Sequence, residues 1–299
     1  DWSSDVCSSD LNARCLYILG RYEEVYSILK WDDIRILDDN DARMLIDSTI
    51  RTGDITTALK MIESIRGKQN LYMDSMIMMG DYYRDKKNFS KAREIYGQIL
   101  VSGESDEFKE RANLELAVIN TENGAYAISM ELLDHVVSKK YQSDKDSLTI
   151  INNFASGNNK AAADMTDAKL KSVTAGRFEE KILLFNLQYH YEQKNEKNFM
   201  RYASMLKNYR ENETYINYLT AKLYYEKENY SKAAQYFYKL TAGENKYMSE
   251  AEYYSGLIGL VQNKSLANSQ KYFTGITSPD KEKNEYYYKS RIELAMICH

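Results

Sequence analysis

The stretch from Met76 to Leu100, MIMMGDYYRDKKNFSKAREIYGQIL, decides how the chain folds. Both halves carry their apolar residues at intervals of three and four, which is one face of an α-helix. These residues are Met76, Met79, Gly80 and Tyr83 in the first half, and Phe89, Ala92, Tyr96 and Ile99 in the second. The polar sequence KKN between them predicts a tight turn. The stretch therefore predicts a hairpin of two short amphipathic helices that cross closely where Gly80 and Ala92 are small.

Other segments repeat this pattern along the chain. Taking the small residue of each second helix as an anchor, the first anchors are Val25, Ala58, Ala92 and Ser129, which lie 33, 34 and 37 residues apart. The segment 217–240 aligns with the opening stretch nearly position for position, with Ala233 as its anchor and Phe237 in the place of Tyr96. A further unit follows at 251–276, with Ser269 as its anchor and Phe273 in that aromatic place.

The middle of the chain follows the pattern less closely. A pair over 147–170 has Ala161 or Ala162 as its anchor, and the next pair, over 179–209, has Asn198 where an alanine is expected. An asparagine at that place predicts a looser crossing or a shifted register. In this second pair we expect Tyr189 and Tyr202 to fill the aromatic places.

The small-aromatic-small-aromatic order at these offsets resembles the tetratricopeptide repeat, whose period is about 34 residues. The resemblance covers nearly all of 12–299 and implies an all-α, right-handed superhelical solenoid of about eight antiparallel helix pairs, in which neighbours bury each other's apolar faces. We expect an N-terminal block over 12–140, degenerate repeats over 141–209 and a C-terminal block over 210–299. The stretch 138–148 is the best candidate for a hinge between blocks.

Both ends of the sequence depart from the repeat. Residues 1–11, DWSSDVCSSDL, resemble the translation of a sequencing adapter, so we exclude them from the predicted fold. At the other end, YYYKSRIELAMICH reads as a first helix without its partner, so we expect the last repeat to be truncated. The proline-poor composition, rich in Lys, Asn, Ile and Tyr, is typical of an AT-rich bacterial genome.

Composition and motifs argue against several classes of function. The net charge of -4 does not fit a general nucleic-acid surface, and no apolar run is long enough for a transmembrane segment. The three histidines lack a second ligand at metal-binding spacing, and no phosphate-binding or catalytic fingerprint is present. We therefore expect no metal, no cofactor and no enzymatic activity.

Tyrosine is the most informative residue type, because 18 of the 27 tyrosines lie in residues 151–299. About half fill packing positions of the repeat. In the family, first helices line the concave groove, and the surplus tyrosines fall near such positions. The predicted peptide-binding residues are Tyr191, Tyr215, Tyr218, Lys222, Tyr225 and Tyr254, and the same reasoning places Asp74, Asp81 and Asp85 in the groove of an earlier unit. Tyrosine offers a large contact area and a hydroxyl group for peptide carbonyls.

The sequence thus favours a scaffold or adaptor that holds a peptide or a partner helix in its groove. One alternative is that the array is the helical segment of a larger enzyme, signalling protein or envelope-anchored protein. Self-association is a further possibility, because an open stack exposes an apolar helix face at each end. The sequence leaves the partner and the cellular compartment open.

Overall fold

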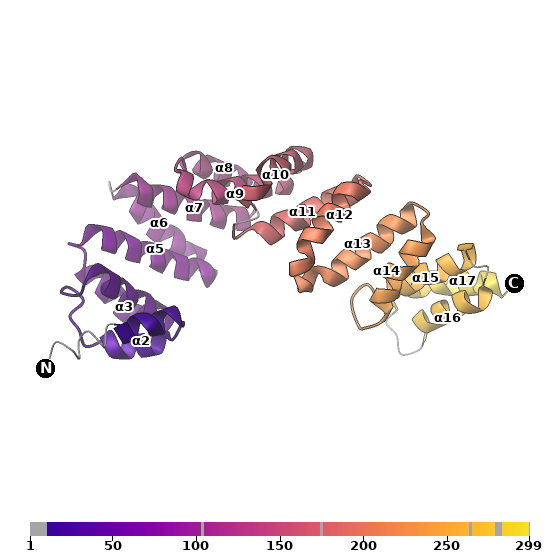
Figure 1. The fold of residues 1–299 in the computed structure, drawn as a ribbon, viewed down its shortest axis with the longest axis horizontal. Coiled ribbons are helices and arrows are strands. Elements are labelled where there is room, and N and C mark those ends of the chain that lie inside the picture. The colour runs from indigo at the N-terminus through magenta and orange to yellow at the C-terminus, as the bar shows by residue number, and fades with distance from the viewer. Residues whose placement is uncertain (1–10, 103–104, 174–175, 263–264, 279–282, 299) are drawn as a thin grey trace. The chain divides into compact units, whose positions relative to one another are not determined.

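The computed structural model describes residues 11–102, 105–173, 176–262, 265–278 and 283–298. These residues form α-helices, short 3-10 helices and turns, and no strand occurs among them. The chain divides into two compact units, unit 1 from Asp1 to Phe178 and unit 2 from Glu179 to His299. In each unit the helices pair into hairpins that follow one another along the chain (Figure 1).

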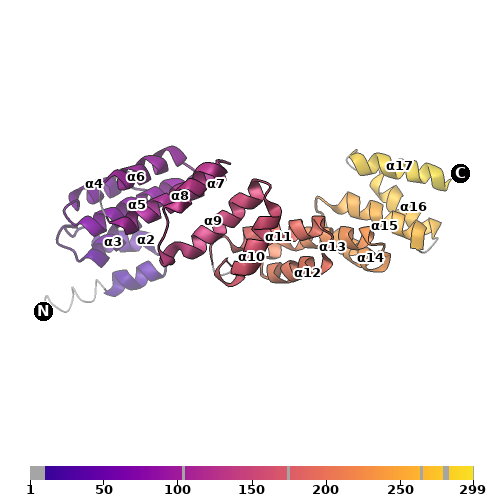
Figure 2. The same ribbon diagram turned by 90° about the horizontal axis from the view of Figure 1, so that it is seen from above.

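Unit 1 contains five hairpins within its described residues. A helix over 11–18 pairs with α2 (Tyr22–Leu29), α3 (Asp39–Arg51) with α4 (Ile55–Ser64), α5 (Gln69–Asp85) with α6 (Phe89–Val101), α7 (Asp106–Glu122) with α8 (Tyr126–Asp134), and α9 (Gln142–Ala155) with α10 (Asn159–Val173). The short helix η1 (Lys139–Tyr141) precedes α9. The side-by-side pairing of α5 with α6 and of α7 with α8 is visible from two directions (Figures 1 and 2).

Unit 2 contains three hairpins and one further helix within its described residues. The pairs are α11 (Glu179–Glu192) with α12 (Glu196–Met205), α13 (Glu213–Glu226) with α14 (Tyr230–Thr241), and α15 (Met248–Gln262) with α16 (Leu266–Ile276), and α17 (Glu285–Ile297) follows. Two 3-10 helices, η2 (Leu206–Asn208) and η3 (Arg210–Asn212), connect α12 to α13.

One turn geometry closes seven of the hairpins. The second residue after the first helix has a positive φ in each of them, and it is Gly20, Gly53, Lys87, Gly124, Gly157, Lys194 or Glu228. In six of these turns the next backbone N–H donates to the carbonyl five residues earlier, as from Asn88 to Tyr83. This is the Schellman arrangement, which satisfies carbonyls left open at a helix C-terminus and favours glycine because a Cβ is strained there.

The predicted anchors lie in the core of their hairpins. Val25, Ala58, Ala92, Ser129, Ala162, Ala233 and Ser269 all have no exposed surface. The helices α5 and α6 cross closely, as predicted for the opening stretch. A Cβ added to Gly80 would lie only 2.5 Å from Cε1 of the fully buried Tyr96. Small residues are therefore required where the two helices of a hairpin cross.

The pair α11 and α12 departs from this register, as the asparagine predicted. Asn198 is half-buried, and α12 buries Phe199 and Tyr202 completely instead. On α11 it is His190 that is buried and stacks on the Tyr202 ring, with centroids 5.4 Å apart, whereas Tyr189 is half-buried. The predicted aromatic place is thus filled by Tyr202 on one helix and by the histidine on the other.

The chain is therefore an all-α solenoid of helix pairs like those of the tetratricopeptide repeat. Residues 138–148, where a hinge was predicted, form η1 and the first half of α9 inside unit 1. The division into blocks at 140 and 209 stays a prediction. Residues 1–10, most of the segment that resembles an adapter, lie outside the described residues.

Candidate functional site

The six predicted binding residues all lie on first helices of unit 2. Tyr191 is on α11, Tyr254 is on α15, and Tyr215, Tyr218, Lys222 and Tyr225 are on α13. All six are half-buried, so each shows part of its surface to solvent. We call this surface of α11, α13 and α15 the first-helix face of unit 2.

A carboxylate on α15 joins three of these residues. Glu250 accepts hydrogen bonds from the Tyr218 hydroxyl group at 3.1 Å and from Lys222 Nζ at 3.0 Å. Lys222 Nζ also donates to the Tyr254 hydroxyl oxygen at 2.8 Å and lies 4.2 Å from the centroid of that ring. These contacts connect residues 28 to 32 positions apart, which is about one repeat, so they hold consecutive first helices together.

The charges of this cluster depend on one another. Burial raises the pKa of the Tyr218 hydroxyl group, and the Glu250 carboxylate raises it further. Burial by itself would lower the pKa of Lys222, but its bonds to Tyr254 and Glu250 outweigh that effect and raise it. Only 16% of the Lys222 side chain and 12% of the Glu250 side chain are exposed, so solvent screens this ion pair weakly. The charge of Lys222 is therefore already paired with Glu250 within the same chain.

Tyr215 lies at a cavity of about 690 Å³ between α11, α13 and the segment that leads into α15. Leu184, Phe185 and Gln188 line it from α11, and Tyr247 lines it from the other side. The Tyr215 hydroxyl group donates to Gln188 Oε1, and its ring stacks on Tyr247 with centroids 6.3 Å apart. The exposed Lys181 and Lys246 also line the cavity. Exposed Glu211 lines it as well, so the cavity is an aromatic hollow with charged groups of both signs beside it.

The other two predicted tyrosines extend the face in the opposite direction. Tyr225 packs edge-on against Tyr254, with centroids 4.6 Å apart, and also contacts Phe237 in the core. The Tyr191 hydroxyl group donates to Glu226 at 3.0 Å. Tyr218 also stacks on Tyr247, with ring centroids 4.1 Å apart. Five of the six predicted residues are thus linked through direct contacts or through Tyr247 and Glu250, and Tyr191 contacts Glu226 of the same face.

Three of the five predicted tyrosines have hydroxyl groups that do not fit the role first expected of them. Those of Tyr191, Tyr215 and Tyr218 donate their hydrogens to Glu226, Gln188 and Glu250. A tyrosine hydroxyl group has a single hydrogen to donate and lone pairs that accept. These three groups can therefore accept from a peptide N–H, but in this arrangement they cannot also donate to a peptide carbonyl.

Sequence reasoning missed Tyr247, Glu250 and Gln188. Tyr247 precedes α15, so it lies outside the helical periodicity that selected the other tyrosines. Glu250 carried a usable signal, because it lies 28 residues after Lys222 and an opposite charge about one repeat away predicts an ion pair between neighbouring first helices. No feature of the sequence around Gln188 marked it as a residue of this face.

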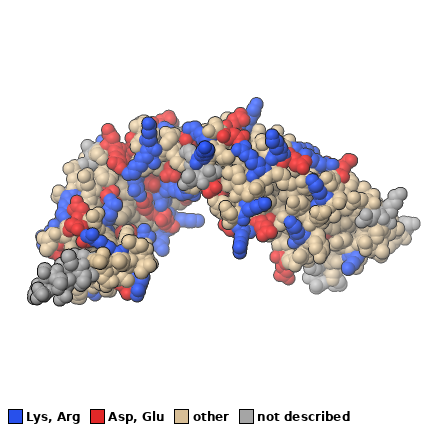
Figure 3. Space-filling model, in the orientation of Figure 1, with Lys and Arg blue, Asp and Glu red and all other residues tan. Residues whose placement is uncertain are grey.

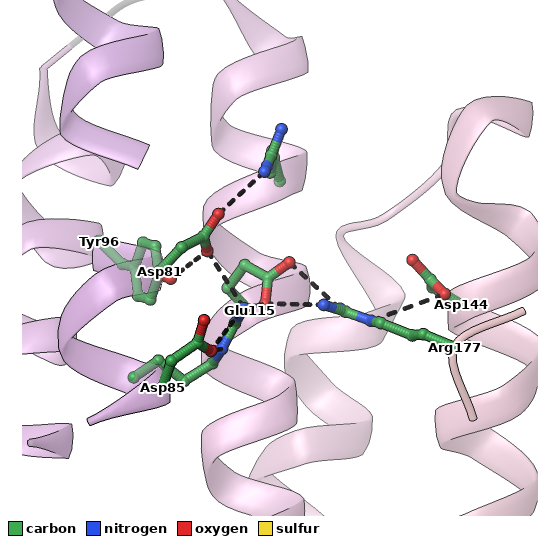
Figure 4. A network of polar contacts seen from close by, with 8 residues as sticks. Asp81, Asp85, Tyr96, Glu115, Asp144 and Arg177 are labelled. Carbon is green, nitrogen blue, oxygen red and sulfur yellow. Dashed lines mark hydrogen bonds and ion pairs between the residues drawn. The ribbon is translucent and has the colours of Figure 1, made fainter. Parts of the chain in front are cut away.

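Unit 1 carries a different set of contacts on its first helices (Figure 4). Arg84 on α5 forms ion pairs with Asp81, Asp85 and, on α7, Glu115. Glu115 also accepts from Arg177 Nη2 at 3.1 Å, and only 5% of the Glu115 side chain is exposed. Burial raises the pKa of Glu115, although the neighbouring Arg177 and Arg84 act in the opposite direction.

The acidic groove residues predicted in unit 1 all take part in such pairs. Asp74 pairs with Arg43 on the preceding first helix, and Asp81 pairs with Arg111 on the next one at 3.0 Å. Asp81 also accepts from the Tyr96 hydroxyl group at 2.7 Å (Figure 4). Asp85 is exposed and pairs with Arg84. First helices of unit 1 are therefore bridged by arginine and carboxylate groups, whereas tyrosine rings and hydroxyl groups dominate in unit 2.

No part of the described chain gathers His, Cys, Asp or Glu side chains in a group of three that could hold a metal ion. Among the described helices, none is long and apolar enough to cross a membrane. On the face drawn in Figure 3, acidic and basic side chains are mixed over each unit, so neither unit presents a surface of one sign there.

No protein-family model and no curated protein matches this chain. Solved structures are similar to it at low sequence identity. A tetratricopeptide repeat protein from Parabacteroides merdae has 14% identity and a TM-score of 0.47, over 85% of this chain and 96% of that chain. A monomeric variant of IFIT1 with m7Gppp-AAAA has 13% identity and a TM-score of 0.40, over 97% of this chain and 81% of that chain. The human IFIT1 dimer with m7Gppp-AAAA has 13% identity and a TM-score of 0.37, over 97% and 80%.

Proposed function

We propose that this protein is a binding scaffold, without catalytic activity of its own, that holds a peptide segment or a partner helix on the first-helix face of unit 2. The observation that carries the proposal is the meeting of residues from α11, α13 and α15 at one face, which ends in the aromatic cavity beside Tyr215. Half-buried aromatic rings that are already fixed by their neighbours lose little freedom when a partner covers them.

The geometry supports a division of roles along this face. The cavity lined by Leu184, Phe185, Tyr215 and Tyr247 can take a large apolar side chain of the partner. The hydroxyl oxygens of Tyr191 and Tyr218 can accept hydrogen bonds from the partner's N–H groups. Lys222 serves instead to hold α13 against α15 through Glu250, so its removal would disturb the face rather than delete a direct contact.

A selection from a phage-displayed library of short random peptides on the complete chain tests the proposal without knowledge of the natural partner. Enriched peptides are then titrated against the Tyr215→Ala variant and against the matched variant Tyr238→Ala. Tyr238 is 68% exposed on the second helix α14, outside the proposed face. Circular dichroism checks that both variants keep their helix content.

We expect Tyr215→Ala to weaken binding about tenfold or more, as truncation of an aromatic anchor does, and Tyr238→Ala to leave it within about twofold. The proposal fails if no peptide is enriched, or if the two variants bind the enriched peptides equally well. A Tyr218→Phe variant refines the test, because it removes the bond to Glu250 and keeps the ring.

A further inference from the structure

A second cavity, of about 540 Å³, lies on the other side of α13. Ile216 and Thr220 line it, and successive helical positions place them opposite Tyr218 and Lys222. Its remaining walls come from α12, from the 3-10 helices over 206–212 and from α14. The connection through η2 and η3 separates α12 from α13, and the space between these consecutive hairpins stays open.

One part of the lining of this cavity is apolar, and the other part is polar. Met200 and Ala203 contribute from α12, Ile216 from α13, and the rings of Tyr209 and Tyr236 from opposite sides. Both rings are held in place. The Tyr209 hydroxyl group donates to Glu179 at 3.0 Å, and the Tyr236 ring stacks on Tyr224 with centroids 6.0 Å apart. Two rings of the lining are thus held by contacts within the chain, and the volume of the cavity is in the range typical of sites for small organic ligands.

The rim of the cavity is cationic. Lys207, Arg210 and Lys239 line it together with a single carboxylate, Glu213. The side chains of Lys207 and Arg210 are exposed, and neither has an ion-pair partner among the described residues. Lys239 Nζ lies 4.8 Å from the centroid of the Tyr236 ring, directly beside the apolar wall. Three cations and one carboxylate line the cavity, and a second carboxylate, Glu179, is bonded to the Tyr209 hydroxyl group. Lys207 and Arg210 are therefore the charged groups at the rim that are open to an anion.

We propose that this cavity binds a small amphipathic anion, a molecule with one carboxylate, sulfonate or phosphate group on an apolar body. The apolar body would lie between Met200, Ile216 and Tyr236, and the charged group would lie at the rim beside Lys207 and Arg210. Guanidinium and ammonium groups form short charge-assisted hydrogen bonds to such anions. The site is separate from the first-helix face, so the two can be occupied at the same time.

The test uses the complete chain and the fluorescent probe 8-anilinonaphthalene-1-sulfonate, which combines an aromatic body with a sulfonate. We expect binding of one probe per chain, and competition by dodecanoate. The Lys207→Gln/Arg210→Gln variant should bind the probe at least about tenfold more weakly, the effect of losing one charge-assisted bond or more. The matched variant Lys271→Gln/Lys283→Gln removes two exposed lysines of unit 2 that line neither cavity and should bind as the parent does.

Further outcomes decide against the proposal. Equal probe binding by the two double variants, or several equivalent probes per chain, would show general apolar binding and overturn it. Displacement by dodecanol as effective as that by dodecanoate would mean that the charge is not recognised. Displacement by inorganic phosphate at the same concentration would mean that the apolar body is not recognised. An Ile216→Arg variant, which places a charged side chain in the wall, should abolish probe binding while circular dichroism stays unchanged. The Tyr215→Ala variant should bind the probe normally, so this test can fail independently of the proposed peptide binding.

Discussion

The same substitution, glycine to alanine, should have opposite effects at two positions of one hairpin. Gly80 lies in α5 and Gly97 in α6, both within helices. Alanine stabilises a helix interior by about 1 kcal/mol relative to glycine, so both variants start from the same gain. What differs is the space that the new Cβ would enter.

At Gly80 the new methyl group would lie 2.5 Å from Cε1 and 2.8 Å from Cζ of Tyr96, whereas at Gly97 nothing lies within 4 Å. The Tyr96 ring is fully buried and its hydroxyl group is bonded to Asp81, so it cannot move aside. Overpacking of this kind costs about 1–3 kcal/mol. We expect Gly80→Ala to lower the unfolding free energy by up to about 2 kcal/mol and Gly97→Ala to raise it by about 1 kcal/mol.

Hydrogen exchange of the backbone amides in α5 and α6, followed by mass spectrometry on the complete chain, measures this difference locally. A local readout is needed because repeat arrays can unfold in parts, so a single denaturation midpoint can hide a change in one hairpin. Exchange in the hairpin should accelerate in Gly80→Ala and slow in Gly97→Ala. If both substitutions stabilise the hairpin, α5 and α6 cross at a larger distance than described, and the reasoning is wrong.

Three more predictions concern charge, turns and pH. Arg84→Met should destabilise unit 1 by about 3 kcal/mol in urea denaturation, because it leaves the buried Glu115 with one arginine fewer; adding Glu115→Gln should recover part of the loss. Lys87→Gly and Glu228→Gly should each stabilise the chain by about 0.5–1 kcal/mol in thermal or urea unfolding, because glycine relieves the positive φ of 57° and 58° and this gain exceeds its entropic cost. Burial, with the nearby Glu293, raises the pKa of Tyr253 from 10.0 to about 12. A raised folded-state pKa gives stability that is complete below pH 10 and is lost as the pH rises towards 12; unfolding measured across this range should show a smaller loss for Tyr253→Phe.

Each of these has its control. A cost below about 1 kcal/mol for Arg84→Met would be that of an exposed ion pair and would contradict the buried network. Lys86→Gly, one residue before Lys87 and with a negative φ of -79°, should destabilise rather than stabilise. Equal alkaline losses in the parent and in Tyr253→Phe would remove that tyrosine from the explanation.

Much of the fold can be predicted from the sequence because the same spacing of small and aromatic residues recurs in successive hairpins. Each hairpin needs a small residue where its helices cross, and seven of the anchors identified by spacing lie fully buried. Glycine occupies the positive-φ position of several turns, as at Gly53 and Gly124, because it adopts this conformation without strain. The turn around Lys87 was predicted from the polar sequence KKN, but the positive φ of Lys87 and Glu228 was not, because an ordinary residue can adopt the left-handed region when the surrounding helices impose it.

The candidate sites depended more on the tertiary structure. Periodicity placed Tyr215, Tyr218 and Lys222 on one helix face, since a helix fixes the direction of its own side chains. Which groups they contact is decided by the neighbouring repeat. The spacing of Lys222 and Glu250 was compatible with an ion pair, but the structure was needed to identify that pair among the possible ones. The division between Phe178 and Glu179 also has no counterpart in local sequence.

The sequence by itself thus determined the class of fold, the register of most hairpins and the helices on which the candidate residues lie, because these depend on the spacing of residues within a single repeat. The tertiary structure alone decided which tyrosine hydroxyl groups are already bonded, where arginine–carboxylate pairs bridge the helices of unit 1, and where the cavity between α12 and α13 opens. Those features depend on contacts between repeats about 30 residues apart, whose geometry is set by packing.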